Sequence, residues 1–213
     1  MAFFLIQLIM KFIAHRGLTN KFIKENTLEA FQNAIDNGFL GFECDVRLTK
    51  DKIPVICHDP FIDRTSNKKG LIKSLTYKEL LKANFGTKTN PSKLPTLKEV
   101  LKYKCIKVIE LKCYIPLKKY IKLIDDKTYF ISFNPFIINR IKKEYPNLKI
   151  GLLSTVKEIK NYKHNLICIL DEFAKKENIN KYLEKNIDIF IYGIIGKINT
   201  VSNSVFYITD KKY

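Results

Sequence analysis

The sequence lacks the features that mark several large classes of protein. Its 213 residues contain no run of about 18 apolar side chains, the length that a membrane-spanning helix requires. The five cysteines include no Cys-x-x-Cys pair and no spacing typical of a zinc site. No linker, internal repeat or low-complexity tract interrupts the chain. These absences argue against a membrane-spanning protein or a zinc module, and we expect one domain over residues 1–213.

The start of the chain also lacks the marks of a secretory signal. Residues 1–9 are apolar, but they have no basic n-region and no small-residue cleavage pattern. They run directly into residues 11–15, which we expect to form a strand, so cleavage would leave little room for a signal. We interpret residues 1–9 as an N-terminal extension and Met10 as an alternative start.

Acidic residues are scarce beside basic ones, since 38 Lys and Arg against 21 Asp and Glu give a net charge of +17. A charge of this size often marks a nucleic-acid-binding protein. Here lysine is spread over the whole chain, and no arginine-rich arm or aromatic RNA-binding motif occurs, so we expect no nucleic-acid partner. The basic surface would still attract anionic phosphodiesters and, weakly, anionic membrane surfaces.

The cysteines indicate a cellular compartment. An odd number without pairing motifs fits buried free thiols better than a disulfide framework. They occupy apolar, strand-like positions: Cys44, Cys57, Cys105, Cys113 and Cys168. We therefore expect a reducing compartment, the cytoplasm.

Short β-rich segments alternate with helical stretches along the whole chain, which is typical of a parallel α/β architecture. The expected strands are 11–15, 39–46, 105–112, 127–133, 148–153, 166–170, 187–193 and 204–209. The expected helices are 27–37, 96–103, 115–125, 135–144, 155–161 and 175–185, the first with Asn26 as its N-cap. Eight strands are the number needed to close a barrel, so we predict a single (β/α)8 barrel of the TIM type.

Residues 53–58 break this alternation. Only the four residues 49–52 separate this β-rich run from the strand before it, whereas a parallel crossover needs about a dozen. We therefore predict a short antiparallel β-hairpin inserted after the second barrel strand, followed by an excursion over residues 59–104.

A four-residue loop also predicts the register of this hairpin. Leu48 would pair with Ile53, and Glu43 would then lie opposite His58 on the same face of the sheet. The same register would bring Cys44 and Cys57 together on the other face, as free thiols.

Three acidic side chains fall in otherwise apolar strands. Glu43 and Asp45 are two residues apart, so both side chains point to one face. Glu110 lies near the end of the next expected strand, with Lys112 on its face. Buried carboxylates repel one another unless a cation lies between them, and hard oxygen ligands suit Mg²⁺ or Ca²⁺. The pattern favours one divalent cation over the alternative of carboxylates that face water or an arginine.

Two of the three histidines end β-rich segments. His15 is followed by Arg16 and Gly17, and His58 is followed by an Asp-Pro pair. A histidine pair can supply a general acid and a general base near neutral pH, and an arginine fork suits phosphate oxygens. These residues predict phosphodiester chemistry, although the sequence does not assign the acid and the base. His164 lies in a polar loop, and we give it no role.

A series of short motifs runs along the chain from residue 11 onward. In the first half these are His15-Arg-Gly17, Glu25-Asn-Thr27, Glu43-Cys-Asp45, Thr49-Lys-Asp51, His58-Asp59 and Arg64-Thr65. In the second half they are Ile109-Glu-Leu-Lys112, Ser132-Phe133, Gly151-Leu-Leu153 and Ile208-Thr-Asp210. In identity and order they resemble those of the glycerophosphodiester phosphodiesterase family.

The resemblance implies a barrel enzyme that hydrolyses glycerophosphodiesters to glycerol 3-phosphate and an alcohol. It implies His15 and His58 as the catalytic pair, and Arg16 and Lys112 as phosphate contacts. It further implies that the metal ligands are Glu43, Asp45 and Glu110. By the family's chemistry, the glycerol hydroxyl beside the phosphate would be the nucleophile and would give a cyclic phosphate.

The chain departs from the family's pattern late in the sequence. Where the family has Trp-Thr-x-Asn on the seventh strand, this chain has Ile191-Tyr-Gly-Ile194, and it contains no tryptophan. The closing Thr-Asp-x-Pro is here Thr209-Asp-Lys-Lys212. These changes affect the wall that would hold the substrate alcohol, so two alternatives stay open. One is a lysophospholipase D-type enzyme acting on lysophospholipids or sphingolipids, and the other is a non-catalytic barrel that binds phosphodiesters or lipid headgroups.

Overall fold

Nine strands form one continuous sheet in the computed structural model, which describes residues 11–156, 159, 162–194, 202 and 204–211. The predicted extension 1–9 and the alternative start Met10 lie outside the described residues. The strands are β1 (Phe12–Ala14), β2 (Gly41–Leu48), β3 (Pro54–Ile56), β4 (Ile106–Leu111), β5 (Thr128–Ser132), β6 (Lys149–Ser154), β7 (Leu166–Leu170), β8 (Asp188–Tyr192) and β9 (Val205–Thr209).

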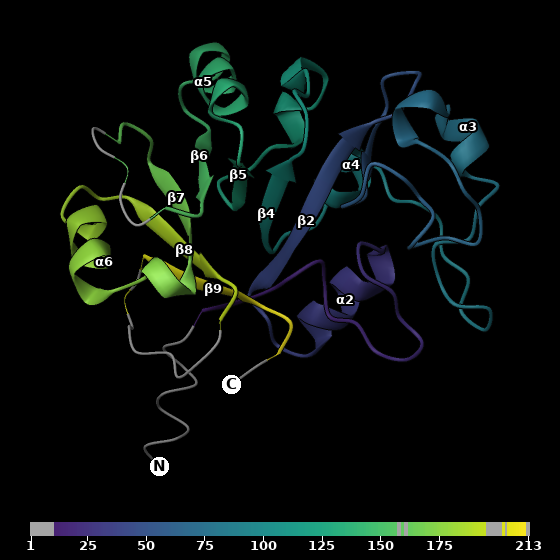
Figure 1. Cartoon of the computed structure of the whole chain (residues 1–213), viewed down its shortest axis with the longest axis horizontal. Helices are drawn as coiled ribbons and strands as arrows, with labels where there is room; N and C mark the ends of the chain where they lie inside the picture. Colours follow the sequence, from purple (N-terminus) through teal and green to yellow (C-terminus); the bar gives the residue numbers. More distant parts are fainter. Residues whose placement is uncertain (1–10, 157–158, 160–161, 195–201, 203, 212–213) are drawn as a thin grey trace.

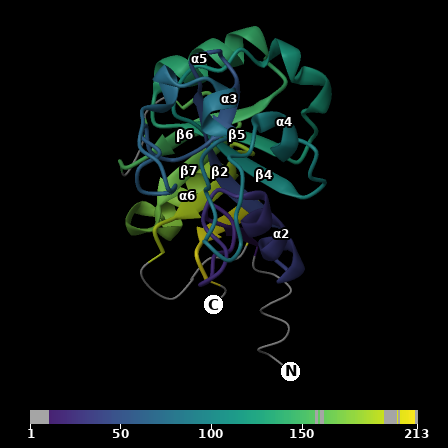
Figure 2. The same ribbon diagram turned by 90° about the vertical axis from the view of Figure 1, so that its right-hand side faces the viewer.

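The sheet closes on itself because β1 pairs with both β9 and β2. Every barrel pairing is parallel, and among the described strands only β3 runs antiparallel, beside the C-terminal end of β2 that extends past β1. The predicted (β/α)8 barrel with a β-hairpin after the second barrel strand is therefore confirmed. Figures 1 and 2 show helices around the outside of the strands and the segment that carries α3 and α4 beside β2.

The helices cover the barrel unevenly. They are α2 (Leu28–Asp36), α3 (Tyr77–Leu80), α4 (Leu97–Val100), α5 (Pro135–Glu144) and α6 (Lys176–Leu183), with η1 (Ile72–Ser74) and η4 (Asp171–Phe173) as 3₁₀ turns. None of the helices in the described part of the chain is both long and apolar enough to cross a membrane.

Two expected helices differ from the structure. The segment 115–125 forms two 3₁₀ turns, η2 (Leu117–Lys119) and η3 (Ile121–Leu123), and no side chain caps the start of either turn. The hydrogen bonds of a 3₁₀ turn have poorer geometry than those of an α-helix, so such turns stay short, as both do here. In the expected helix 155–161, residues 155, 156 and 159 are not helical and the remaining positions lie outside the described residues.

The strand pattern creates two cores, one inside the barrel and one outside it. Inside lie alternate residues such as Ile13, Val108 and Phe190, all fully buried. The larger core packs the outer strand faces against the helices, as where Phe31 of α2 stacks on Phe42 of β2 with ring centroids 4.1 Å apart. Apolar filling of the barrel interior leaves its C-terminal end as the place where polar side chains gather.

The predicted hairpin register is wrong by one residue. Val46 pairs with Ile56, and Leu48 pairs with Pro54 instead of Ile53. Lys52 takes a positive φ of 60° and Ile53 closes the turn by hydrogen bonds to Thr49, so the loop is longer than four residues. Glu43 is therefore not opposite His58.

The same slip separates the two cysteines. Cys44 is buried in the core between barrel and helices, whereas Cys57 belongs to a separate core under the 59–104 segment. Both are free thiols, as expected.

Candidate active site

The turn after β1 brings two site residues to the C-terminal rim. Gly17 has a φ of +80°, and a Cβ there would lie 2.7 Å from the backbone carbon of Ala30 on α2, so only glycine fits this turn. His15 Nδ1 lies 3.0 Å from Asp210 Oδ1 just past β9, and because a carboxylate can only accept, Nδ1–H donates. The backbone N–H of Arg16 donates to Glu43 Oε2 at 3.1 Å.

The loop between β1 and α2 contains Asn26, which we expected from the sequence to cap α2. Thr27, not Asn26, is the N-cap of α2, and its side chain accepts from the backbone N–H of Ala30. Asn26 instead takes a φ of 56° and donates from Nδ2 to Asp45 Oδ2 at 2.9 Å. The expected cap is thus a support for the carboxylate cluster. The Glu25-Asn-Thr27 motif was the sequence feature that could have indicated this role for Asn26.

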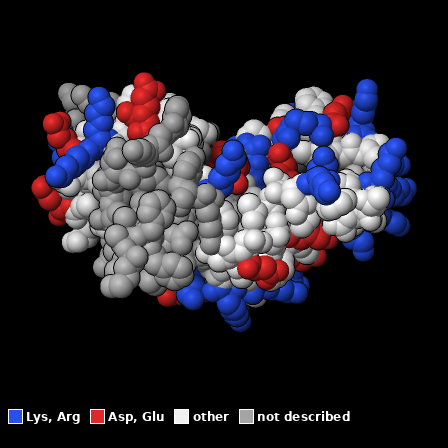
Figure 3. All heavy atoms as spheres, turned by 90° about the horizontal axis from the view of Figure 1, so that it is seen from below, with Lys and Arg blue, Asp and Glu red and all other residues white. Residues whose placement is uncertain are grey.

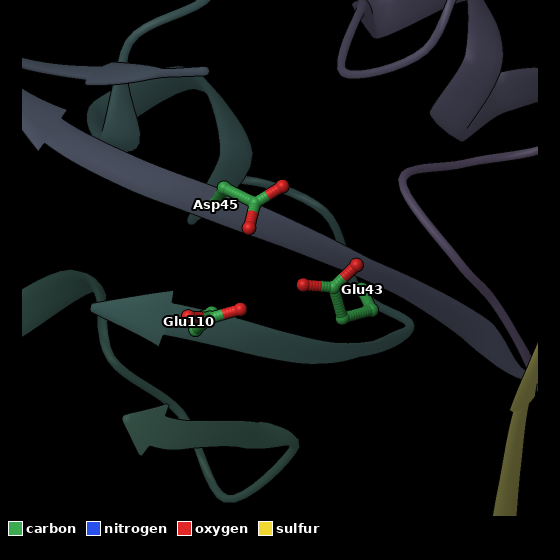
Figure 4. A group of neighbouring side chains, drawn as sticks. All are labelled: Glu43, Asp45 and Glu110. Carbon is green, nitrogen blue, oxygen red and sulfur yellow. The ribbon is translucent and has the colours of Figure 1, made fainter. Parts of the chain in front are cut away.

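The three predicted metal ligands lie together inside the barrel mouth. Glu43 and Asp45 come from β2 and Glu110 from β4, and all three are buried. Their ligand atoms lie within 4.8 Å of one another, and the side chains point toward a common centre (Figure 4). Lys112 reaches the same group, with Nζ 2.6 Å from Glu110 Oε1 and 3.1 Å from Asp45 Oδ1.

The charges within this cluster are unequal. Burial and the negative charge of Asp45 raise the pKa of Glu43 to about 8. Burial also works against the ionised form of Asp45, but Lys112, the hydrogen bond from Asn26 and the Arg16 guanidinium outweigh it, so the pKa of Asp45 is lowered. Asp45 therefore carries the stable negative charge, while Glu43 tends to hold a proton when no cation is near.

This arrangement fits a divalent cation. Oδ1 of Asp45 is buried and paired with the Lys112 ammonium at 3.1 Å, and its second lone pair can still bind a further ligand. The donor set is oxygen only, as Mg²⁺ and Ca²⁺ prefer. A cation among the carboxylates would also remove the repulsion that raises the pKa of Glu43. The cluster can thus hold a hard divalent cation such as Mg²⁺ or Ca²⁺.

His58 reaches the site by a different route from the one predicted. The ladder ends at Ile56, so the direction of the His58 side chain is set by the following turn and not by the strand pleat. Arg47 fixes this turn by donating from Nε and Nη2 to the His58 carbonyl, at 2.9 and 2.6 Å. His58 therefore lies at the site as predicted, but the predicted pairing with Glu43 across the hairpin is not what places it there.

An ion-pair network joins the His58 side of the mouth to the Arg16 side. His58 Nδ1 lies 2.7 Å from Asp59 Oδ1, and Arg64 Nε donates to the other Asp59 oxygen at 2.6 Å. Arg64 also donates twice to Glu25, which accepts from Arg16 as well. The hydrogen bonds from Arg64 and then His58 lower the pKa of Asp59 to about 2. The sequence motifs contain Glu25, Asp59, Arg64 and Asp210, but sequence reasoning gave none of them a role.

A cavity of about 140 Å³ lies at the centre of these groups. Every predicted site residue except Asp45 lines it, and Asp45 lies beneath it with 1% of its surface exposed. The side formed by β1 to β4 is polar, with His15, Arg16, Glu43, His58, Glu110 and Lys112. The side formed by β5 to β9 is mainly apolar, with Ile131, Phe133, Leu153, Cys168, Tyr192 and Ile208. A reacting group in this cavity would face two histidines, two cationic side chains and the carboxylate cluster at once.

Solved structures share this fold. The chain superposes on a glycerophosphodiester phosphodiesterase from Agrobacterium tumefaciens with a TM-score of 0.77 at 22% identity, covering 95% of each chain. It superposes on an Oleispira antarctica phosphodiesterase, solved with the product sn-glycerol 3-phosphate, with a TM-score of 0.74 at 23% identity. That match covers 89% of this chain and 86% of the other. At these identities the likeness establishes the barrel alone.

Sequence relatives are more informative. Over 159 residues the chain is 39% identical to a glycerophosphodiester phosphodiesterase of Caldanaerobacter subterraneus, a match that covers 66% of this chain and 65% of that relative. It is 38% identical over 95 residues to human glycerophosphodiester phosphodiesterase 1, covering 42% of this chain and 28% of that protein. The aligned part therefore spans just under two thirds of the first relative and less of the second. Residues 15–189 match the glycerophosphoryl diester phosphodiesterase family, and the chain belongs to that family.

Proposed function

We propose that this protein hydrolyses glycerophosphodiesters to glycerol 3-phosphate and an alcohol. The observation that carries the proposal is one cavity lined by two histidines, each hydrogen-bonded to a carboxylate, by two cationic side chains and by two buried glutamates, with Asp45 beneath it. The comparisons support the same activity. A sequence relative is named a glycerophosphodiester phosphodiesterase, and a structural neighbour was solved with the product sn-glycerol 3-phosphate.

Arg16 and Lys112 are the groups that bind the phosphate. Arg16 Nε is buried, donates no hydrogen bond to any described residue and lies 3.5 Å from Asp45 Oδ2, so it keeps one donor for a phosphate oxygen. Lys112 Nζ has two carboxylate partners and can donate a third hydrogen bond. A guanidinium fork beside an ammonium group suits an anionic phosphodiester.

The histidines move the protons. Each uses Nδ1 on a neighbouring carboxylate, Asp210 for His15 and Asp59 for His58, which leaves Nε2 of both rings for the substrate. One ring removes the proton from the glycerol hydroxyl beside the phosphate as its oxygen bonds to phosphorus, and the other donates a proton to the leaving alkoxide as the P–O bond breaks. Water then opens the resulting cyclic phosphate, with the two rings in exchanged roles, and gives glycerol 3-phosphate. The carboxylates hold the rings in the required tautomer.

Glu43, Asp45 and Glu110 are the residues that would hold a divalent cation. When bound, such a cation supplies positive charge that stabilises the negative charge developing on the phosphate and the leaving oxygen. Asn26 holds Asp45 in place for this task through its amide hydrogen bond. The backbone N–H of Arg16 does the same for Glu43.

The test is release of glycerol 3-phosphate from a panel of glycerophosphodiesters with Mg²⁺, Ca²⁺ and Mn²⁺, each with and without a chelator. We expect turnover that the chelator abolishes and that one of the metals restores. Binding of the substrates without turnover under any metal would overturn the proposal and leave a phosphodiester-binding barrel.

A further inference from the structure

A second and larger cavity opens beside the catalytic one. It has a volume of about 540 Å³, against about 140 Å³ for the catalytic cavity. Three residues, His15, Tyr192 and Ile208, line both cavities, so the two spaces adjoin along one edge. Its volume falls in the range of about 300–1,000 Å³ that is usual for sites binding ligands larger than a glycerol headgroup.

The larger cavity, called the cleft below, has a mostly apolar wall among the described residues. Leu170, Tyr192, Ile194 and Ile208 supply the wall, and the hydroxyl of Tyr192 donates to the Ser154 carbonyl at 3.2 Å, which leaves its ring to line the space. Leu170 lies over Gly193, since a Cβ on that glycine would be 2.6 Å from Leu170 Cδ1.

The cleft also has polar lining residues, of which His15 lines the catalytic cavity as well. They are His15, Thr209, Asp210 and Lys211, and Asp210 is already hydrogen-bonded to His15. A ligand that filled the cleft would therefore place a polar end beside His15 and an apolar remainder along Leu170 and Ile194.

Tyr192 ends β8 and Ile194 lies two residues further along the chain. Both side chains line the cleft. An apolar wall adds little to the binding of a small polar alcohol such as glycerol, but it stabilises a hydrocarbon chain in proportion to the area that it covers.

We propose that the preferred substrate is a phosphodiester in which one of the two alcohols carries an apolar chain, and that this chain lies in the cleft lined by Leu170, Tyr192, Ile194 and Ile208. The inference rests on the proposed function, because it requires the phosphate to lie in the catalytic cavity. The chain then leaves the phosphate past His15 and enters the cleft along the shared edge. The chemistry is the same whether the chain is an acyl group on the glycerol or belongs to the leaving alcohol.

Two chain-length series test the inference and separate these two sources of the chain. One is a set of glycerophosphoalkanols with ethanol, butanol, hexanol and octanol as the leaving alcohol. The other is glycerophosphocholine acylated on its primary hydroxyl with acetyl, butyryl, hexanoyl or octanoyl groups, all assayed below their micelle-forming concentrations. In one of the two series we expect kcat/KM to rise about two- to fourfold for each methylene that the cleft covers.

Variants in the wall show whether the cleft is responsible. Leu170→Asn is expected to flatten the rising series, with the octyl or octanoyl member losing at least tenfold more in kcat/KM than the shortest member. Ile194→Asn gives a second, independent disruption in case Leu170→Asn folds poorly. The control is Leu81→Asn, at a surface leucine of the 59–104 segment that is 40% exposed, which should leave both series unchanged.

The outcomes separate this inference from the proposed function. If no member of either series is hydrolysed, the ethyl and acetyl compounds included, the proposed function fails. If the short members are hydrolysed but neither series rises with chain length, the chain-binding inference alone is overturned. A rise that persists in both Leu170→Asn and Ile194→Asn would also overturn it, since the chain would then lie elsewhere.

Discussion

At the scale of single residues, the two histidines are equivalent in one respect and different in another. Both use one ring nitrogen on a carboxylate, but Asp59 is itself held by Arg64, whereas Asp210 is 74% exposed as a side chain. We expect His15→Ala and His58→Ala each to lower kcat by roughly 10²-fold or more, the usual loss for a general acid or base. The measurement is steady-state release of glycerol 3-phosphate with the fold verified by circular dichroism.

The third histidine is the matched control for this pair. His164 lies in the loop before β7, where it contacts the Tyr162 ring, and it lines none of the site. His164→Ala should keep kcat within about twofold of the parent. Turnover near the parent value in a folded His15→Ala or His58→Ala protein would remove that residue from the mechanism.

Asp210 sets the protonation of His15. Burial disfavours the imidazolium of His15, but the hydrogen bond to Asp210 and the charge of Glu43 outweigh it, so the pKa of His15 is raised. Asp210→Asn removes a negative charge that stabilises the imidazolium, and the pKa must fall. We expect the limb of the pH–kcat profile that follows His15 to move to lower pH, as would the His15 titration followed by NMR. An unchanged profile would show that Asp210 does not act through His15.

Glu43 tests the proposed metal site. Glu43→Gln keeps the volume and the hydrogen bond from Arg16 but removes one charge from a set of three, so divalent cations should bind at least tenfold more weakly. Isothermal titration with Mg²⁺ and Ca²⁺ gives this directly, alongside the metal concentration for half-maximal activity. Glu144→Gln on the outer helix α5 is the control. Metal affinity and activity equal to the parent in Glu43→Gln would exclude Glu43 as a ligand.

At the scale of elements, the strands were predictable from the sequence and the turns were not. Parallel barrel strands are buried on both faces and read as continuous apolar runs bounded by polar residues, so all eight could be placed within a few positions. The hairpin register depended instead on the length of one loop, where Lys52 adopts a positive φ that the sequence does not signal. A one-residue error there inverted the predicted face of every residue in β3.

The candidate site was predictable for a related reason. Except for His58, its predicted members lie in or directly after barrel strands whose positions were correct, and the carboxyl ends of parallel strands meet at one rim. The supporting residues Asn26 and Arg64 lie in loops, where contacts depend on backbone geometry that no periodicity encodes. Asn26 was therefore assigned to helix capping, although its position before a threonine left the cap to Thr27.

The β1–α2 turn offers a prediction at this scale. In Gly17→Ala the new Cβ meets the backbone of Ala30, which cannot move without shifting α2, and the residue keeps a strained positive φ. We expect a loss of more than about 1 kcal/mol in the free energy of unfolding, measured by urea denaturation. Gly193→Ala has a similar φ of +67° but meets only the flexible Leu170 side chain, so it should cost less. An equal loss in the two variants would show that packing on Ala30 is unimportant.

At the scale of the whole molecule, the net charge of +17 comes from Lys and Arg residues that are spread along the whole chain. Figure 3 shows Lys and Arg scattered over the viewed face beside Asp and Glu, with no continuous basic stripe. A diffuse positive field of this kind raises the encounter rate of any anion and gives no sequence or shape selectivity. It is therefore compatible with an enzyme whose substrate is an anionic phosphodiester.

The field should be visible in the salt dependence of the reaction. Glycerophosphoglycerol carries one net negative charge, whereas glycerophosphocholine has the same phosphodiester with a cationic headgroup and no net charge. Added salt shortens the Debye length from about 10 Å at 0.1 M, so kcat/KM for the anionic substrate should fall several-fold between about 0.05 and 0.5 M NaCl. For the zwitterionic substrate the fall should be much smaller, and kcat should change little for both because screening acts mainly on the encounter. Parallel salt dependences for the two substrates would mean that recognition depends on the contacts of Arg16 and Lys112 inside the cavity and owes nothing to the charge of the whole chain.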